Sequence, residues 1–276
     1  MFALVASLLL TPSFAEDSEF AGTEAPVIEE VAEDKEPETK LSAEFGTAFA
    51  TGNAIFYTVA GSITASHEWD RNKLGAIGGI NLGAAKADAD GDGLLSQAER
   101  DADYARNVQR YFAEGRYDRF LSDKDSIYVL AGAFQDPFAG YDLRSHEQVG
   151  YSRRLIKNDT SELVTELGFD YAQENYTDEA VAGGSEPYQD VFAARILLGG
   201  SHTFNDSVSV SNTFEYYQNV VDFNDVRILN TAALTTTLSG KLSLKLSHSL
   251  IFDNVPVEGF VSLDQTTMAT LVASIL

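Results

Sequence analysis

Apolar and polar residues alternate along most of the chain from about residue 42 onward. Residues 241–252 show it most clearly: one face carries Leu242, Leu244, Leu246, Leu250 and Phe252, and the other carries Lys241, Ser243, Lys245, Ser247 and Ser249. A period of two is typical of a β-strand whose two faces meet different surroundings. The same period recurs over residues 54–69, 161–174 and 191–204, so the pattern predicts sheet almost throughout.

Connections of two kinds separate these segments. Short polar turns fall at residues 69–73, 122–125, 157–159, 205–206 and 239–240. Longer connections fall at 86–107, 135–140, 175–190, 221–225 and 254–260, and a "TGN" turn stands at 51–53. Eleven connections predict twelve strands, and the alternation of short and long is typical of outer-membrane barrels.

Alternation alone does not separate a membrane barrel from a soluble sheet, because both have one polar face. The predicted polar faces carry charges of both signs at Glu114, Arg116, Arg144, Glu166, Asp170, Arg195, Lys241 and Lys245. In lipid a sheet must close on itself, with an apolar outside and a polar lumen. The sequence therefore predicts an all-β fold, a twelve-stranded antiparallel outer-membrane β-barrel; a soluble secreted β protein that binds calcium is the alternative.

The first 41 residues differ from the rest of the chain. Residues 2–10 are apolar and lead to small residues ending at Ala15, which resembles a secretory signal peptide over residues 1–15. No Lys or Arg precedes that run, which leaves the true start open, and a buried N-terminal strand is the alternative. Residues 16–41 are strongly acidic and poor in apolar surface, so we expect a disordered linker before a barrel over 42–276.

Overall composition narrows the function. The chain has 276 residues, with 19 basic against 42 acidic residues and a net charge of −23, which argues against a nucleic-acid partner. It has no cysteine, so disulfides and thiolate chemistry are excluded. No segment after residue 15 approaches the ~18 apolar residues of a spanning helix, so we expect the lipid of the outer membrane to be met by strands.

Three strings resemble a known family. "TGNA" at 51–54, the block from Gly115 to Ile156 ("GRYDRFLSDKDSIYVLAGAFQDPFAGYDLRSHEQVGYSRRLI") and "ELGFDYAQENYTDE" at 166–179 look like the YdiY-type family of salt-stress-induced outer-membrane proteins. The resemblance covers residues 42–276. It implies a twelve-stranded outer-membrane barrel and no particular activity.

The connection at 86–107 holds "DADGDGLLSQAE", which fits the EF-hand calcium loop. The predicted ligands are Asp88, Asp90, Asp92, the carbonyl of Leu94, Ser96 and, as the bidentate residue, Glu99. Gly93 supplies the sharp turn, and Ser96 with Glu99 forms a capping box that predicts a helix to about Arg106. We expect one Ca²⁺ ion in this external inserted segment; an acidic turn without an ion is the alternative.

Few residues in the sequence favour an enzyme. Strand register places His67, His202 and His248 on the lipid side, and places His146 inside with Arg144, near Glu166 or Asp170. No serine stands at a recognisable spacing from His146, and mixed charges inside a barrel ordinarily line the lumen. We therefore predict no catalytic residues and a non-enzymatic protein, a narrow channel or an envelope-stress or maintenance protein, with an outer-membrane hydrolase as the alternative.

Overall fold

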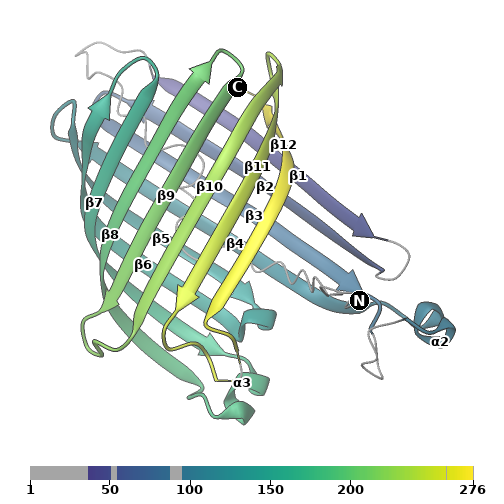
Figure 1. Ribbon diagram of the computed structural model, residues 1–276. Coiled ribbons are helices and arrows are strands. Elements are labelled where there is room, and N and C mark those ends of the chain that lie inside the picture. Colours follow the sequence, from purple (N-terminus) through teal and green to yellow (C-terminus); the bar gives the residue numbers. More distant parts are fainter. Residues whose placement is uncertain (1–36, 51–54, 88–94, 259, 276) are drawn as a thin grey trace, which may run out of the picture.

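The computed structural model describes residues 37–50, 55–87, 95–258 and 260–275, and these form a closed barrel (Figure 1). Each strand pairs antiparallel with its neighbours in the chain, and β1 pairs with β12. The strands are β1 (Glu38–Ala50), β2 (Phe56–Trp69), β3 (Asn72–Ala85), β4 (Ala105–Phe120), β5 (Asp125–Asp136), β6 (Tyr141–Lys157), β7 (Ser161–Tyr176), β8 (Tyr188–Asn205), β9 (Val208–Asn219), β10 (Val226–Ser239), β11 (Leu242–Asp253) and β12 (Leu263–Ser274). The predicted all-β, twelve-stranded antiparallel barrel is confirmed.

The first strand fixes the start of the barrel. β1 begins at Glu38, so the barrel starts earlier than the predicted residue 42, and residues 38–41 are strand rather than linker. The predicted signal peptide over 1–15 and the linker up to residue 36 lie outside the described residues and stay predictions.

The strands place apolar side chains outside and polar side chains inside. On β8, Val191, Ala193 and Arg195 are buried, whereas Phe192 and Ile196, at the alternate positions, are exposed. Exposed large hydrophobic residues of this kind occur on every strand, and the buried polar residues include several arginines and carboxylates. No helix among the described residues is long and apolar enough to span a membrane.

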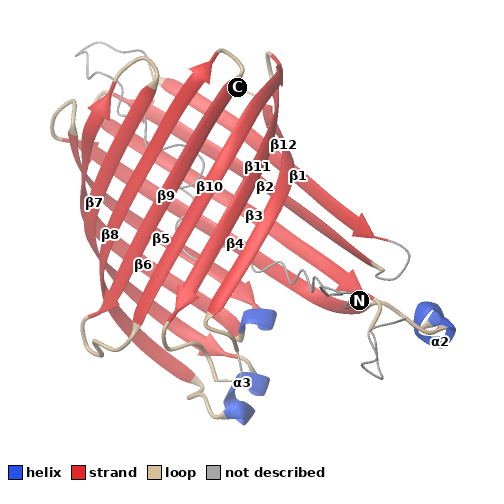
Figure 2. Ribbon diagram, viewed as in Figure 1, coloured by secondary structure: helices blue, strands red, loops and turns tan. Residues whose placement is uncertain are grey.

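The two ends of the barrel differ (Figure 2). Short turns join β2 to β3, β4 to β5, β6 to β7, β8 to β9 and β10 to β11, and the longer connections gather at the other end. Helices α2 (Gln97–Asp101) and α3 (Asp178–Gly183) and the 3₁₀ turn η1 (Pro137–Ala139) belong to the longer connections. Longer loops face outward in outer-membrane barrels, so we name this end the outer end.

Helix α2 begins as predicted but is shorter than predicted. Its capping box is present, since Ser96 Oγ accepts from Glu99 N and Glu99 Oε2 accepts from Ser96 N. The helix ends at Asp101, however, and not at the predicted Arg106, because β4 begins at Ala105 and takes up the rest of the segment.

Candidate functional site

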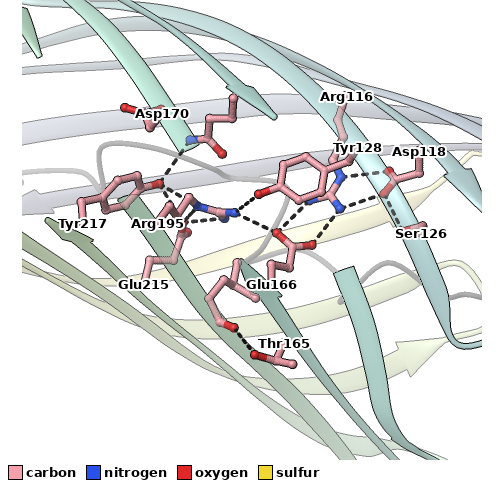
Figure 3. A network of polar contacts seen from close by, with 12 residues as sticks. Arg116, Asp118, Ser126, Tyr128, Thr165, Glu166, Asp170, Arg195, Glu215 and Tyr217 are labelled. Carbon is pink, nitrogen blue, oxygen red and sulfur yellow. Dashed lines mark hydrogen bonds and ion pairs between the residues drawn. The ribbon is translucent and has the colours of Figure 1, made fainter. Parts of the chain in front are cut away.

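The inner face of β4–β9 carries a network of buried charges (Figure 3). Glu166 on β7 lies between two arginines: Arg116 Nη2 of β4 is 2.7 Å from its Oε1, and Arg195 Nη1 of β8 is 2.8 Å from its Oε2. Arg116 also pairs with Asp118 at 2.8 Å, and Arg195 with Glu215 at 2.6 Å. We call these five side chains, with Tyr128 and Tyr217, the charge network.

Two tyrosines complete the charge network. Tyr128 presents its ring to the guanidinium of Arg116, 4.1 Å from the ring centroid, and its hydroxyl accepts from Arg195 Nη1 at 2.8 Å. Its position depends on glycine, because a Cβ at Gly150 or Gly168 would lie 2.5 or 2.6 Å from the Tyr128 hydroxyl. Tyr217 donates to Glu215 Oε2 at 2.8 Å and accepts from Arg195 Nε at 3.0 Å.

A second set of ion pairs lies closer to the outer end. Glu174 on β7 accepts from Arg144 of β6 at 3.0 Å and from Arg227 of β10 at 2.7 Å, and Arg227 Nε is 3.0 Å from Asp253 Oδ2 of β11. Arg144 and Glu174 stand on neighbouring strands, as do Arg227 and Asp253. The pair of Arg227 with Glu174 joins β10 to β7, which are not neighbours, so this contact ties the cylinder across part of its lumen. In the loop above them, burial raises the pKa of Asp225, while Arg227 acts in the opposite direction.

His146 is buried, and carboxylates lie on two sides of it. Its Nε2 is 3.6 Å from Glu114 Oε2 and its Nδ1 is 3.6 Å from Asp170 Oδ1, with Gln148 Nε2 3.4 Å from Nδ1. The expected neighbourhood with Asp170 is confirmed. Arg144 pairs instead with Glu174, and Glu166 is held by two other arginines, so the structure does not bring Arg144, His146 and Glu166 together as one site.

The other three histidines lie on the outer face of the barrel, as predicted. His67 and His248 are exposed, and His202 is half-buried. Each bonds a hydroxyl at the surface: Thr39 is 2.8 Å from His67, Thr267 is 2.9 Å from His248 and Ser161 is 2.8 Å from His202. Each of these histidines therefore makes an ordinary contact between neighbouring side chains on the surface of the barrel.

The inner face of β9–β12 has a different character. Besides the charged residues Glu215, Arg227, Lys245 and Asp253, it carries a set of small hydroxyl residues: Thr213, Thr231, Ser243, Ser247, Ser249, Thr266 and Thr270. We call this surface the hydroxyl wall. Ser243, Ser247 and Ser249 are half-buried, whereas Arg195 and Glu166 of the charge network are 1 % exposed. Lys245, among these serines, pairs with Glu44 of β1 at 2.9 Å. The part of the hydroxyl wall on β11 is therefore more accessible than the charge network, whereas Thr213, Thr266 and Thr270 are buried.

A strap crosses the outer mouth. The connection between β11 and β12 carries Val257 and Phe260 to the connection between β5 and β6, half-way round the barrel. A Cβ at Gly140, which has φ +90°, would lie 2.9 Å from Val257 Cγ1 and 3.0 Å from Phe260 Cε2. Glu258 N donates to Ser185 Oγ at 3.2 Å. We call Val257, Glu258 and Phe260 the strap, and its apolar partners the outer cluster: Phe112, Phe134, Ala139, Tyr141, Tyr176 and Ala180.

Only part of the predicted calcium loop is described. Ser96 and Glu99 stand at the start of α2, joined by their capping hydrogen bonds. Asp88, Asp90, Asp92 and Leu94 lie outside the described residues. The described residues contain no cluster of three or more metal-ligating side chains.

The sequence pattern could have predicted three further residues of the lumen. Glu174, Glu215 and Arg227 continue the inward positions of their strands, so the alternation that placed Glu166 and Arg195 could have found them. Tyr128 and the strap give no such signal, because their importance depends on contacts across the closed barrel.

An apolar exterior around a buried, charged interior defines a transmembrane β-barrel of the outer-membrane type. Residues 43–275 match the family described as "Protein of unknown function, DUF481", and the chain belongs to that family. No curated protein sequence matches the chain. The narrower resemblance to the YdiY-type salt-stress proteins remains a prediction.

Solved structures share the architecture. The NanC porin is 10% identical, with a TM-score of 0.52 over 86% of this chain and 100% of the porin chain. The COG4313 outer membrane channel from Pseudomonas putida F1 is 10% identical, with a TM-score of 0.46 over 87% of this chain and 95% of that channel. The translocator domain of the autotransporter NalP from Neisseria meningitidis is 11% identical, with a TM-score of 0.43 over 87% of this chain and 88% of that domain. At these identities the likeness concerns the fold alone, and of these three structures the NanC porin, with its TM-score above 0.5, is the one that supports it.

Proposed function

We propose that the protein is a non-enzymatic channel in the outer membrane of a Gram-negative bacterium, narrow enough to pass only small polar solutes. The observation that carries this proposal is the uneven filling of the lumen. The charge network is nearly inaccessible on β4–β9, while the serines of the hydroxyl wall are half-buried. A polar path beside a fixed plug is the arrangement of a constricted pore.

The charges named above favour cations or uncharged solutes. In the charge network, Arg116 and Arg195 stand against three carboxylates, those of Asp118, Glu166 and Glu215. Glu114 and Asp170 beside His146 add further negative charge. Because a net negative lumen raises the local concentration of cations, we expect a channel that prefers cations.

Conductance tests this proposal. The refolded protein is expected to conduct in planar bilayers, with a reversal potential in a KCl gradient that indicates cation preference. Ser247→Trp places a large ring in the path along the hydroxyl wall and is expected to reduce the single-channel conductance roughly threefold, since pore diameter limits flow. Leu246→Trp, on the lipid face of the same strand, is the matched control and should conduct as the wild type does.

A barrel that stays silent in this measurement would contradict the channel. The result would favour the second candidate, an envelope-maintenance protein, because the strap over the outer mouth and the ion pair of Arg227 with Glu174 also suit a barrel that stays closed. Its induction under salt stress rests on the family resemblance alone. The hydrolase alternative requires a hydrolytic activity that His146→Ala abolishes. The contacts of His146 with carboxylate and amide groups favour a non-enzymatic protein.

We further propose that the outer segment 86–107 binds one Ca²⁺ ion through Asp88, Asp90, Asp92, Leu94, Ser96 and Glu99, which stiffens the longest outer loop. The ligands in this template are all oxygen atoms, which supports the proposal because Ca²⁺, a hard cation, prefers six to eight oxygen ligands. The helix that starts after Ser96 and carries Glu99 also fits the template. As a solitary external module, the site should have an affinity near ~10⁻⁴–10⁻³ M.

Terbium luminescence checks the ion site. Glu99→Gln removes the bidentate ligand and is expected to weaken binding about tenfold or more, since affinity follows the number of charged ligands. Asp101→Asn, two residues further along α2 and outside the ligand template, is the control and should bind normally. Equal binding by Glu99→Gln and the wild type would eliminate the site.

A further inference from the structure

The closure between β1 and β12 is incomplete. Their pairing covers five residue pairs, from Ser42↔Ser274 to Gly46↔Thr270, whereas β1 and β2 are paired over the whole of β1. Beyond Gly46, the described backbone of Thr47–Ala50 pairs with β2 alone, and residues 263–269 pair with β11 alone. In Figure 1 the arrowhead of β1 and the start of β12 lie clearly apart.

The seam parts next to a tightly packed glycine. A Cβ at Gly46 would lie 2.8 Å from Thr270 Cγ2 and 3.4 Å from Met268 Cε. Because Gly46 has no side chain, Met268 of β12 reaches over β1 and packs against Ala60 of β2 and Val108 of β4. The two strands are thus in close contact at Gly46 and separate on its outer side.

A parted seam is costly in lipid. Backbone N–H and C=O groups that lack a ladder partner in hydrocarbon cost several kcal/mol each, which is why spanning sheets close. The outer half of this seam therefore needs a partner when the barrel is in the membrane. The bilayer that surrounds it supplies amphipathic molecules at that level.

The lumen directly behind the parted seam is itself amphipathic. Met268, Ala60 and Val108 form an apolar patch. On either side of Met268 along β12 lie Thr266 and Thr270, which are 7% and 6% exposed, and their hydroxyl oxygens are buried without a hydrogen-bond partner. A threonine hydroxyl can both donate and accept, so these two groups can bind a polar head while the patch holds a chain. The strap covers the axial exit above, so access from the side is the more direct route.

We propose that the outer half of the β1–β12 seam is a lateral portal through which the acyl chain of a single-chain amphipath enters the lumen from the bilayer. The chain lies on Met268, Ala60 and Val108, and an oxygen of the head group binds the hydroxyls of Thr266 and Thr270. The portal rests on the proposed membrane location of the barrel and is independent of whether ions pass along the hydroxyl wall.

Fluorescence quenching by chain-labelled lipid tests the portal. The chain has one tryptophan, Trp69, at the inner end of β2, so Trp69→Phe gives a silent background for single reporters. In liposomes that contain a doxyl-labelled fatty acid, Met268→Trp reports on the lumen behind the seam. Ser211→Trp, at the same level of the ladder but on β9, reports on the lumen away from it. Leu246→Trp, on the lipid face, reports on membrane insertion.

We expect the Met268→Trp variant to be quenched at least half as strongly as Leu246→Trp, and Ser211→Trp only weakly. Since the chain has no cysteine, Thr47→Cys with Ala269→Cys, which the continued register would bring together, can lock the seam with one disulfide. Locking should abolish the quenching of Met268→Trp and leave that of Leu246→Trp intact.

Other outcomes of these experiments would contradict the portal, support it, or contradict the membrane location. Equal, weak quenching of Met268→Trp and Ser211→Trp would overturn the portal, as would quenching that persists after the disulfide has formed. A disulfide that forms at the paired positions Ala43→Cys and Ala273→Cys but not at 47 and 269 would support a seam held apart. Lack of quenching in Leu246→Trp would instead contradict the membrane location, so the two failures are distinguishable.

Discussion

Replacing Glu166 with alanine is expected to lower the free energy of unfolding by about 3–5 kcal/mol, the usual cost of leaving a buried charge without its partner. Glu166 is 1% exposed and is shared by Arg116 and Arg195, so its loss leaves two buried guanidinium groups with fewer acceptors. Urea titration of the refolded barrel, followed by its heat-dependent mobility on SDS gels, measures the change.

The matched control for this variant is Glu38→Gln. It also removes one carboxylate of an ion pair, but Glu38 and Lys40 are 51% and 47% exposed, so the expected change is below about 1 kcal/mol. Equal effects of the two substitutions would show that the charge network does not stabilise the barrel. Glu166→Gln, which keeps the shape of the side chain and one acceptor oxygen, should fall between them.

The sequence could predict which residues face the lumen because a strand has a strict period of two. Once residues 161–174 are a strand with Leu167 outside, Glu166 and Asp170 must point inward, and the structure places both there. The same rule holds for Arg195 on β8. The sequence could not predict which of these residues pair with one another across the barrel. Arg116 and Glu166 meet although 50 residues separate them, and their contact depends on the stagger of four strands, which no local pattern contains.

Features at the ends of strands were harder to predict for a related reason. The capping box of α2 could be predicted because its two residues are close in the sequence. The end of the helix depends on where β4 begins, and pairing with β3 sets that position. The parted seam and the strap depend on how the first and last strands meet and on which loop side chains reach across the mouth. Such contacts are decided by the closed cylinder as a whole.

Loosening the strap is expected to raise the single-channel conductance severalfold. Val257→Asn with Phe260→Ser replaces the two apolar side chains that the strap places on the outer cluster. Burying one such side chain is worth about 1.5–3 kcal/mol. Because 1.4 kcal/mol changes an equilibrium tenfold, losing about 3 kcal/mol would raise the ratio of open to closed straps by roughly a hundredfold. Planar-bilayer recording at constant salt measures the result.

Val255→Asn is the control for the strap. It lies in the same connection, is 50% exposed and is outside the outer cluster, so its conductance should equal that of the wild type. Hydrogen exchange at Glu258, whose N–H is bonded to Ser185, reports whether the strap has been released. Released straps with unchanged conductance would mean that ions do not leave through the mouth. The portal between β1 and β12 would be unaffected by that result, because it does not depend on whether ions pass along the hydroxyl wall.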